Sequence, residues 1–325
     1  MHLPQTCLAV AALLTATACA FADTQQTSEP FVGVRVTHTQ SIEPRQVDMW
    51  LVEIDTKAPG ISFLVTPSNG NLIGDTKPET TRAFVTRVGA QIGINGSFFS
   101  MAAKNAPSKG QYNVQGLSAS KGDVYSPFAA GFTDAINFSK DNVPTIIQGI
   151  DKSPQRTAKL TSAKDPKDKP LEVNIGFERK PAVPLYNALS GKHRLVKNGK
   201  KVANKDPAIH PRTAIGIAKN GKLLILTVDG REKDRSLGMK LSELADAMIK
   251  FGARDAINLD GGGSTTLVMD DPTTKANDPQ VLNLPCDPFP NSKETGQIHG
   301  KERATGNNLA VFAKPIRKPA TAKNK

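Results

Sequence analysis

The feature that most constrains the fold of this chain is a pair of apolar runs separated by Asn220-Gly221. Thr213 to Lys219 and Lys222 to Val228 are rich in aliphatic and β-branched residues, and Asn-Gly tolerates the positive φ angles of a type I′ turn. We therefore expect an antiparallel hairpin. A second such pair, Asn198-Gly199, predicts another hairpin over Arg194 to Val202. Hairpins favour antiparallel sheets over a doubly wound parallel sheet.

Only two helices are clear from the sequence. Thr80 or Thr81 is expected to cap the first, and Gly89 to end it. In the second, apolar residues recur at helical spacing before Gly252, at Leu241, Leu244, Ala245, Met248 and Ile249. Together with the hairpins, this predicts an α+β fold: a single domain of mixed, largely antiparallel sheets with a few packing helices.

Eight further segments alternate or run apolar in the manner of strands. They are 32–37, 50–54, 61–65, 91–95, 131–138, 143–147, 256–259 and 309–312.

The N-terminus has the pattern of an export signal. An apolar stretch from Leu8 to Ala20 leads into Ala20-Phe21-Ala22, the small-x-small pattern of a cleavage site. We expect cleavage near Ala22, which makes residues 1–22 a signal peptide and the mature protein periplasmic or secreted. A lipoprotein with lipidated Cys19 is the less favoured alternative, because Ala16 stands where a larger aliphatic residue is usual. Cleavage would leave Cys286 as the sole cysteine, so no internal disulfide is expected, and no other run could cross a bilayer.

Composition suggests further boundaries. Residues 23–30 read as a linker, 31–313 as the domain, and 314–325 as a basic disordered tail. The polar, Lys-rich, proline-broken stretch 152–170 reads as a mobile insertion.

Positive charge is concentrated in one region. The formal net charge is +12, and residues 151–205 alone hold fourteen Lys and Arg against five Asp and Glu. Such a surface attracts anions such as phosphorylated sugars, although a solvated Lys-rich loop accounts for the same composition. Nucleic acid is not expected as a partner, because the chain has only three Tyr and one Trp and no known nucleic-acid module.

Four short segments place polar residues and glycines directly after, or at the start of, apolar strands, where side chains are rigidly supported and exposed. They are Asn95-Gly96-Ser97, Arg212-Thr213, Asp229-Gly230-Arg231 and Asn258-Leu259-Asp260-Gly261-Gly262-Gly263-Ser264. Each of the first three has an ordinary structural explanation: a turn with core phenylalanines, a surface ion pair, and an Asp-Gly turn.

The triple glycine is the strongest of these signals. Asn258 and Asp260 alternate and are expected to point to one side of a strand. Three glycines beside that carboxylate cost backbone entropy, which suggests that a ligand needs the space, and their N–H groups could form an anion-binding nest. The spacing matches neither a Walker P-loop nor the Rossmann fingerprint. Zinc patterns and a G-x-S-x-G elbow are also absent from the sequence.

These segments, in this order, resemble the phosphodiester glycosidase family from about Phe31 to Ala313. The resemblance includes Arg303 and Asn307-Asn308, and departs at Ser97, where the family usually has a second glycine. It implies that one pocket holds Asn95, Gly96, Arg212, Asp229, Arg231, Asn258, Asp260, Gly261, Gly262, Gly263, Ser264, Arg303 and Asn307.

The resemblance implies an exported hydrolase that cleaves a glycosyl phosphodiester or a related phosphorylated glycan. Arginines would hold the phosphate, and Asp260 would serve as general base or nucleophile. Asp229, the second catalytic candidate, would be acid, base or metal ligand. Two alternatives remain: a non-catalytic carbohydrate- or cell-wall-binding module, and a metal-dependent phosphodiesterase. The cofactor is unknown; Ca²⁺ or Mg²⁺ is possible, and the sequence requires none.

Overall fold

The computed structural model describes residues 23–70, 74–101, 112–149, 183–273, 278–287 and 298–316. The predicted signal peptide 1–22 and insertion 152–170 lie outside these residues. Every pair of strands described is antiparallel, which confirms the predicted α+β fold.

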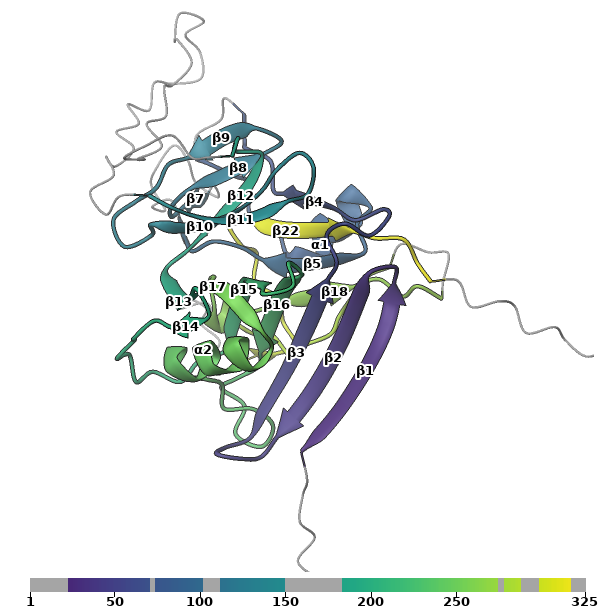
Figure 1. Ribbon diagram of the computed structural model, residues 1–325, viewed down its shortest axis with the longest axis vertical. Coiled ribbons are helices and arrows are strands. Elements are labelled where there is room, and N and C mark those ends of the chain that lie inside the picture. The colour runs from purple at the N-terminus through teal and green to yellow at the C-terminus, as the bar shows by residue number, and fades with distance from the viewer. Residues whose placement is uncertain are drawn as a thin grey trace, which may run out of the picture.

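The largest sheet has eight strands and starts from a long N-terminal ribbon (Figure 1). In spatial order its strands are β1 (Thr24–Phe31), β2 (Val34–Ser41), β3 (Val47–Ile54), β16 (Leu223–Val228), β15 (Arg212–Ala218), β17 (Ala253–Asn258), β13 (His193–Lys197) and β14 (Lys200–Lys201).

Two five-stranded sheets and two short ribbons complete the fold. One sheet is β11 (Pro144–Gln148), β10 (Asp134–Phe138), β12 (Asn187–Gly191), β8 (Ser118–Ser120) and β9 (Asp123–Ser126). The other is β19 (Gln280–Val281), β18 (Leu267–Met269), β5 (Ile92–Asn95), β22 (Asn308–Phe312) and β4 (Ser62–Val65). The ribbons pair β20 (Cys286–Asp287) with β21 (Ile298–His299), and β6 (Phe99–Met101) with β7 (Tyr112–Val114).

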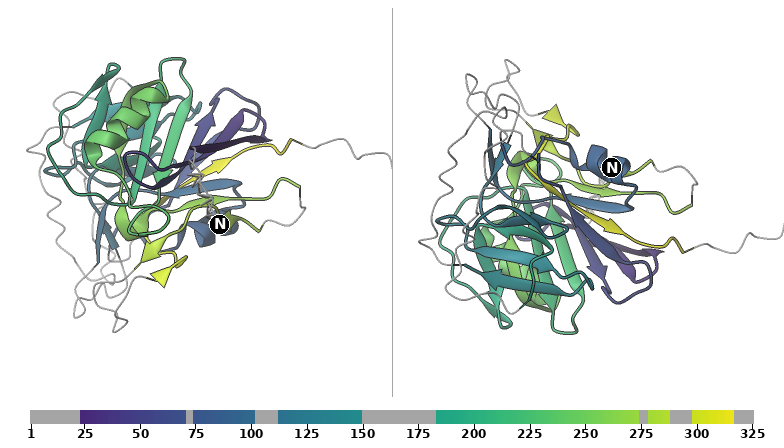
Figure 2. Two further views of the ribbon diagram at one scale, coloured as in Figure 1. Left: turned by 90° about the horizontal axis from the view of Figure 1, so that it is seen from below. Right: turned by 90° about the horizontal axis from the view of Figure 1, so that it is seen from above.

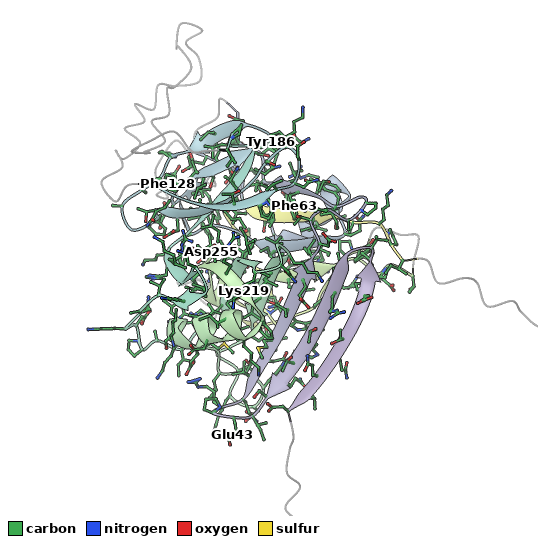
Figure 3. The ribbon with its side chains drawn as sticks, in the orientation of Figure 1. Glu43, Phe63, Phe128, Tyr186, Lys219 and Asp255 are labelled. Atoms are coloured by element: carbon green, nitrogen blue, oxygen red, sulfur yellow. The ribbon has the colours of Figure 1, made fainter. Side chains whose placement is uncertain are left out.

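One hydrophobic core joins the three large sheets. It contains Ile225 of β16, Ile94 of β5 and Leu189 of β12, all fully buried. Phe63, labelled in Figure 3, stacks on Phe138 across two of the sheets, with ring centroids 4.1 Å apart. The sheets therefore form one packed unit rather than separate domains.

Helices cover the outer faces. α2 (Leu241–Lys250) lies on the eight-stranded sheet over β13, β14, β15 and β17, and its apolar face shares one buried cluster with the outward residues Leu224 and Leu226 of β16 (Figures 1 and 2). Alternate residues of β16 face the central core, which explains why that strand is apolar throughout. α1 (Thr81–Val88) packs on the sheet of β5, β18 and β22. No helix among the described residues has the length and apolar character needed to cross a membrane.

The predicted helix signals are confirmed. Thr80 caps α1 by accepting a hydrogen bond from the Ala83 N–H (3.2 Å), and Gly89 ends the helix in the left-handed conformation, with φ of 72°. α2 begins at Leu241, and Gly252 follows it with φ of 87°.

Both Asn-Gly hairpins are present, but their turns differ. Asn198 and Gly199 both have positive φ, 52° and 72°, as a type I′ turn requires. Of Asn220 and Gly221, only Gly221 does, at 85°. The Ala218 carbonyl accepts from the Gly221 N–H, which gives a three-residue loop instead of the predicted type I′ turn.

Two boundary predictions need correction. Residues 23–30 were predicted to be a linker, yet β1 occupies Thr24–Phe31 as the edge strand of the large sheet. Its first six residues are exposed, so the polar composition that indicated a linker reflects an edge strand whose two faces are both exposed over most of its length. The predicted disordered tail, 314–325, begins with residues that pair with β1: the Ile316 N–H donates to the Pro30 carbonyl at 3.1 Å. Residues 317–325 lie outside the described part.

Candidate functional site

The candidate site forms where β17 ends. β17 lies between β15 and β13, and Asn258 faces Ala214 on one side and His193 on the other. The chain then leaves the sheet: the Leu259 N–H donates to the Thr213 carbonyl, and the Asp260 N–H donates to the Gly96 carbonyl at 3.0 Å. The end of β5 and the end of β17 are therefore joined at Asp260, so two of the four predicted segments meet there.

Asp260 is the half-buried carboxylate at the centre of this site. Desolvation by burial raises the pKa of its carboxyl to about 6, although hydrogen bonds from Ser264 and from the Gly261 N–H (2.9 Å) and the charge of Arg303 act in the opposite direction. Ser264 is fully buried, and its hydroxyl oxygen also accepts a hydrogen bond from Arg303 Nη1 at 3.3 Å. Ser264 thus bridges Asp260 and Arg303.

The three glycines allow close contacts with groups of the protein itself. A Cβ on Gly261 would lie 2.8 Å from the Pro211 carbonyl oxygen. On Gly262, which has a φ of 61°, a Cβ would lie 2.9 Å from Arg231 Nη2, and on Gly263 it would lie 2.5 Å from Arg303 Nη2. We predicted that a ligand needs this space; in the structure, two guanidinium groups lie against the loop backbone.

Two adjacent residues of β20 contact those guanidinium groups, and neither was predicted from the sequence. Asp287, which is 4% exposed, accepts from Arg303 Nη2 at 2.6 Å and Nε at 3.0 Å. Cys286 is buried and hydrogen-bonded by Arg231. Burial raises the pKa of its thiol, so the group is a neutral partner. A short Cys-Asp pair in a proline-rich segment carries no periodic or motif signal that could have identified it.

Arg231 retains an uncompensated charge in the described part of the chain. It has a positive φ of 64°, is half-buried, and forms no ion pair with any described residue. A non-glycine residue in the left-handed region is uncommon and often marks a functional position. Arg231 is therefore well suited to bind an anion above Gly262.

Asp229 lies beneath the loop rather than on its surface. It is 2% exposed, and its carboxylate accepts hydrogen bonds from Asn283 Nδ2 (2.9 Å) and the Leu284 N–H (2.9 Å). Burial is the main cause that raises the pKa of Asp229 to about 6, and the nearby Asp48 adds to it. Through these hydrogen bonds Asp229 holds residues 283 and 284 against the end of β16, which is a structural role. Its catalytic role stays a prediction.

Arg212 lies beside the loop, and two of its five N–H donors bind backbone carbonyls. Its Nε donates to the Met239 carbonyl at 2.9 Å and its Nη2 to the Ala208 carbonyl at 2.7 Å. The residue is 7% exposed, and desolvation lowers the pKa of the guanidinium. Since no described carboxylate forms an ion pair with it, its charge contributes to the positive field around Gly261.

The remaining predicted binding residues form a buried network under the site. Asn95, Asn258 and Asn307 are at most 1% exposed. Asn307 accepts from the Ser97 N–H and donates to Ser118 Oγ at 3.2 Å. A Cβ on Gly96 would overlap the Asn307 side chain, which explains that glycine without a ligand. Asn258 alone keeps an unsatisfied atom: its buried Oδ1 has no hydrogen-bond partner among the described residues.

Asn95 connects three strand ends, which leads to a stability prediction. Its Nδ2 donates to the Asp260 carbonyl at 2.8 Å, and its Oδ1 accepts from Thr213 Oγ1 at 2.8 Å and the Thr266 N–H at 3.2 Å. Asn95→Ala should lower the free energy of unfolding by about 3 kcal/mol, because it leaves several buried groups unsatisfied. Urea unfolding measures this, with Asn113→Ala, at an exposed position of β7, as the matched control. Equal stability of the two variants would refute the structural assignment.

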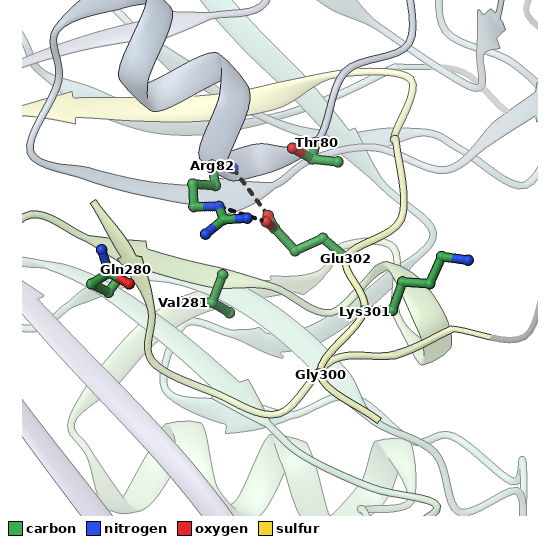
Figure 4. Close-up of a pocket in the computed structure, with 7 residues that line it drawn as sticks. All are labelled: Thr80, Arg82, Gln280, Val281, Gly300, Lys301 and Glu302. Atoms are coloured by element: carbon green, nitrogen blue, oxygen red, sulfur yellow. Dashed lines mark hydrogen bonds and ion pairs between the residues drawn. The ribbon is translucent and has the colours of Figure 1, made fainter. Parts of the chain in front are cut away.

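A metal centre is not evident in the described residues: no three His, Cys, Asp or Glu side chains there come together to hold an ion. A separate cavity of about 610 Å³ is lined by none of the predicted catalytic or substrate-binding residues (Figure 4). It lies between α1 and the segment that precedes Arg303, where Arg82 pairs with Glu302 at 3.3 Å.

Comparison with known proteins gives a consistent assignment. The phosphodiester glycosidase family model matches residues 88–312. The N-acetylglucosamine-1-phosphodiester alpha-N-acetylglucosaminidase of Bos taurus is 36% identical over 104 residues, which cover 26% of this chain and 19% of that protein. The match therefore spans only about a fifth of that relative's length.

Solved structures show the same fold. The catalytic domain of the zebrafish N-acetylglucosamine-1-phosphodiester alpha-N-acetylglucosaminidase, auto-inhibited by its pro-peptide, aligns with a TM-score of 0.58 and 21% identity, covering 90% of this chain and 89% of that one. A putative exported protein from Burkholderia pseudomallei aligns with a TM-score of 0.52 and 16% identity, covering 82% and 74%. Because the family model covers most of the chain, the chain belongs to the phosphodiester glycosidase family.

Proposed function

We propose that this protein hydrolyses a glycosyl phosphodiester, releasing a sugar and a phosphate monoester. The observation that supports it best is the hydrogen-bonded series Asp260–Ser264–Arg303, which places a carboxylate of raised pKa next to a guanidinium at a glycine loop. A carboxylate for the anomeric carbon and a cation for the phosphate are the two groups that this reaction requires.

Arg231 and Arg303 lie against neighbouring glycines, so both can face one phosphate group. The diester carries one negative charge, and a second develops as the bond between the anomeric carbon and the phosphate oxygen breaks and its electron pair moves to that oxygen. Two guanidinium groups stabilise this charge more than they stabilise the substrate, which lowers the barrier. Phosphate is a fair leaving group, so a strong general acid is less necessary here than for an ordinary glycoside.

Asp260 acts on the sugar side of the bond. As a general base it accepts a proton from the water that attacks the anomeric carbon; as a nucleophile it forms a glycosyl ester that water then cleaves. Proton NMR of the first sugar product shows its anomeric configuration. Inversion of configuration indicates that Asp260 is the general base, and retention indicates that it is the nucleophile.

The family and the bovine relative, an N-acetylglucosamine-1-phosphodiester alpha-N-acetylglucosaminidase, support the proposed substrate class. By analogy we assign a sugar-1-phosphate diester on a phosphorylated glycan. We also propose that the protein is exported, on the strength of the signal-peptide pattern in residues 1–22. Cleavage after Ala22 is compatible with the fold, because β1 begins at Thr24 and the large sheet keeps all its strands. N-terminal sequencing of the mature protein should give Asp23 as the first residue.

The pH profile tests the role of Asp260. Both proposed roles need the ionised carboxylate, and its pKa is raised to about 6. We expect kcat/KM to rise with pH through an apparent pKa near 6 and to level off above it. An activity that falls as pH rises through 6 would instead make Asp260 a proton donor.

Isotope labelling tests which bond breaks. In H₂¹⁸O, cleavage of the carbon–oxygen bond puts the label in the sugar, and cleavage of the phosphorus–oxygen bond puts it in the phosphate. We expect label in the sugar, measured by mass spectrometry of both products. Label in the phosphate, with activity lost in chelator and restored by Ca²⁺ or Mg²⁺, would support a metal-dependent phosphodiesterase.

A further inference from the structure

A second group of basic side chains flanks the end of β17, and the proposed mechanism does not use it. Lys192 and His193 come from the start of β13, and His210 and Arg212 come from the start of β15. Both strands are neighbours of β17 and run antiparallel to it. Their first residues therefore lie at the same edge of the sheet as the last residues of β17.

The strand register fixes this placement closely. His193 is the direct partner of Asn258, and the Lys192 N–H donates to the Asn258 carbonyl at 3.0 Å. A Cβ on Gly191 would overlap that same carbonyl, so the segment runs tightly along β17. On the other side, the Pro211 carbonyl accepts from the Gly262 N–H at 2.9 Å, which brings His210 and Arg212 beside the glycine loop.

These side chains lie within electrostatic range of one another. Desolvation is the main cause that lowers the pKa of His193 and of His210, and the Arg212 charge lowers both further. Among the described residues, Asp206 is the one carboxylate whose charge acts on His193, His210 and Arg212, and it is exposed. The local field is thus positive, and the neutral histidines offer N–H donors.

Polar atoms in this region also lack partners. The Nδ1 of His210 and the Oδ1 of Asn258 are buried without a hydrogen bond to any described residue. Asn204 Nδ2 lies 3.4 Å from His193 Nδ1; if it donates there, the proton of the neutral ring is on Nε2. Buried polar atoms without partners are uncommon in proteins and often mark a place where a ligand or water binds.

An aromatic surface adjoins the same group. The Lys192 ammonium lies 5.8 Å from the ring centroid of Phe132, and Phe132 lies 5.6 Å from Phe98. Both rings are half-buried, and Phe98 follows Gly96 and Ser97, next to Asp260. A half-exposed aromatic pair beside polar donors is suited to the apolar face of a sugar or of a short carbon chain.

We propose that Lys192, His193, His210 and Arg212 form a subsite for a second anionic group of the substrate, distinct from the phosphate at the scissile bond. The preferred substrate then carries a further phosphate or carboxylate, either on the aglycone or on the sugar. This inference rests on the proposed function, because it assigns the scissile phosphate to Arg231 and Arg303. Lys192 and His193 select the substrate and take no part in bond cleavage.

Three glycosyl phosphodiesters test this: one with a neutral sugar and a methyl aglycone, one with a phosphoglycerol aglycone, and one with a uronic acid sugar. Wild type should have a kcat/KM about fivefold higher for one acidic substrate than for the neutral one, the upper end of the effect of a charge pair near a protein surface. In the double variant Lys192→Gln/His193→Gln, the preference should fall to within about twofold, with turnover of the neutral substrate unchanged. Lys219→Gln, at the exposed β15–β16 turn, is the matched control.

The acidic substrate that is preferred identifies where the second anion lies. Equal rates for all three substrates in wild type, or a preference that survives in the double variant, would overturn the subsite. If no diester is hydrolysed, the proposed function fails while the subsite is still testable by calorimetry. Wild type should then bind either glucose 1,6-bisphosphate more tightly than glucose 1-phosphate, or the phosphoglycerol diester more tightly than the methyl diester, by about fivefold, and the double variant should bind the members of each pair equally. Equal binding by wild type within both pairs would overturn the subsite as well.

Discussion

An Asp260→Asn variant is expected to lose at least ~10³-fold of kcat on a glycosyl phosphodiester, because the group that accepts a proton or attacks the anomeric carbon is gone. Substrate binding should change little, since Arg231 and Arg303 remain to hold the phosphate. Asp255→Asn is the matched control: Asp255 lies on β17, the strand that leads to Asp260, and pairs with Arg194 away from the loop, so its kcat should stay within about twofold of wild type. The measurement is steady-state kinetics on one substrate for all three proteins.

Stability provides the second readout for the same variant. The pKa of Asp260 in the folded protein is about 6, above its ordinary value of 3.8, so the folded state holds the proton more tightly than the unfolded state does. The ionised group therefore costs stability, and that cost grows as pH rises from about 4 to about 6 and stays constant above. Asp260→Asn removes a cost of up to roughly 3 kcal/mol at pH 8 and almost none at pH 4. Chemical unfolding at pH 4 and pH 8 should show a higher free energy of unfolding for Asp260→Asn only at pH 8. If the variant unfolds more easily than wild type at pH 8, or if it keeps full activity, Asp260 has a structural role instead.

Local sequence signals predicted most of the strands and both helices because each depends on neighbouring residues. The Thr80 cap, the Gly89 stop and the Asn198-Gly199 turn each depend on the conformational preferences of one or two residues. β1 was predicted to be a linker because an exposed edge strand is polar, and composition alone does not distinguish such a strand from a linker. The order of strands in the sheets depends on packing between distant segments, which a single sequence does not reveal.

The candidate site shows the same division. Asp260 and its glycines were identified because the motif is local, and Arg231 because it follows an Asp-Gly pair at the end of a predicted strand. Arg303 was identified through the family resemblance. Asp287 was missed because its importance depends on its position across the loop from Arg303, which only the structure shows. Asn95 and Asn307 were predicted to bind substrate, but the structure surrounds both with protein partners. A motif therefore marks the region of a site, while contacts decide which residue faces the ligand.

A Gly263→Ala variant is expected to lose about 10²-fold of kcat/KM while its fold is retained, the size of effect of removing one preorganised donor. The added Cβ would lie 2.5 Å from Arg303 Nη2 and 3.0 Å from Asp287 Oδ1, so the guanidinium must move away from the loop. Gly263 does not have a positive φ, so alanine adds no backbone strain there. The loss should therefore come from the displaced arginine, and thermal unfolding should shift far less than activity does.

A double-mutant cycle with Arg303→Ala separates this cause from general damage to the loop. If Gly263→Ala acts only by moving Arg303, the double variant should be no less active than Arg303→Ala alone, because the displaced group is already absent. Losses that add in the double variant would mean that the methyl group blocks the substrate directly, and the space above Gly263 would then belong to the ligand, as the triple glycine first suggested. Asp287→Asn completes the test: it keeps the size of the side chain but weakens the pair with Arg303, so it should lower kcat/KM in wild type and have little effect once Arg303 is alanine.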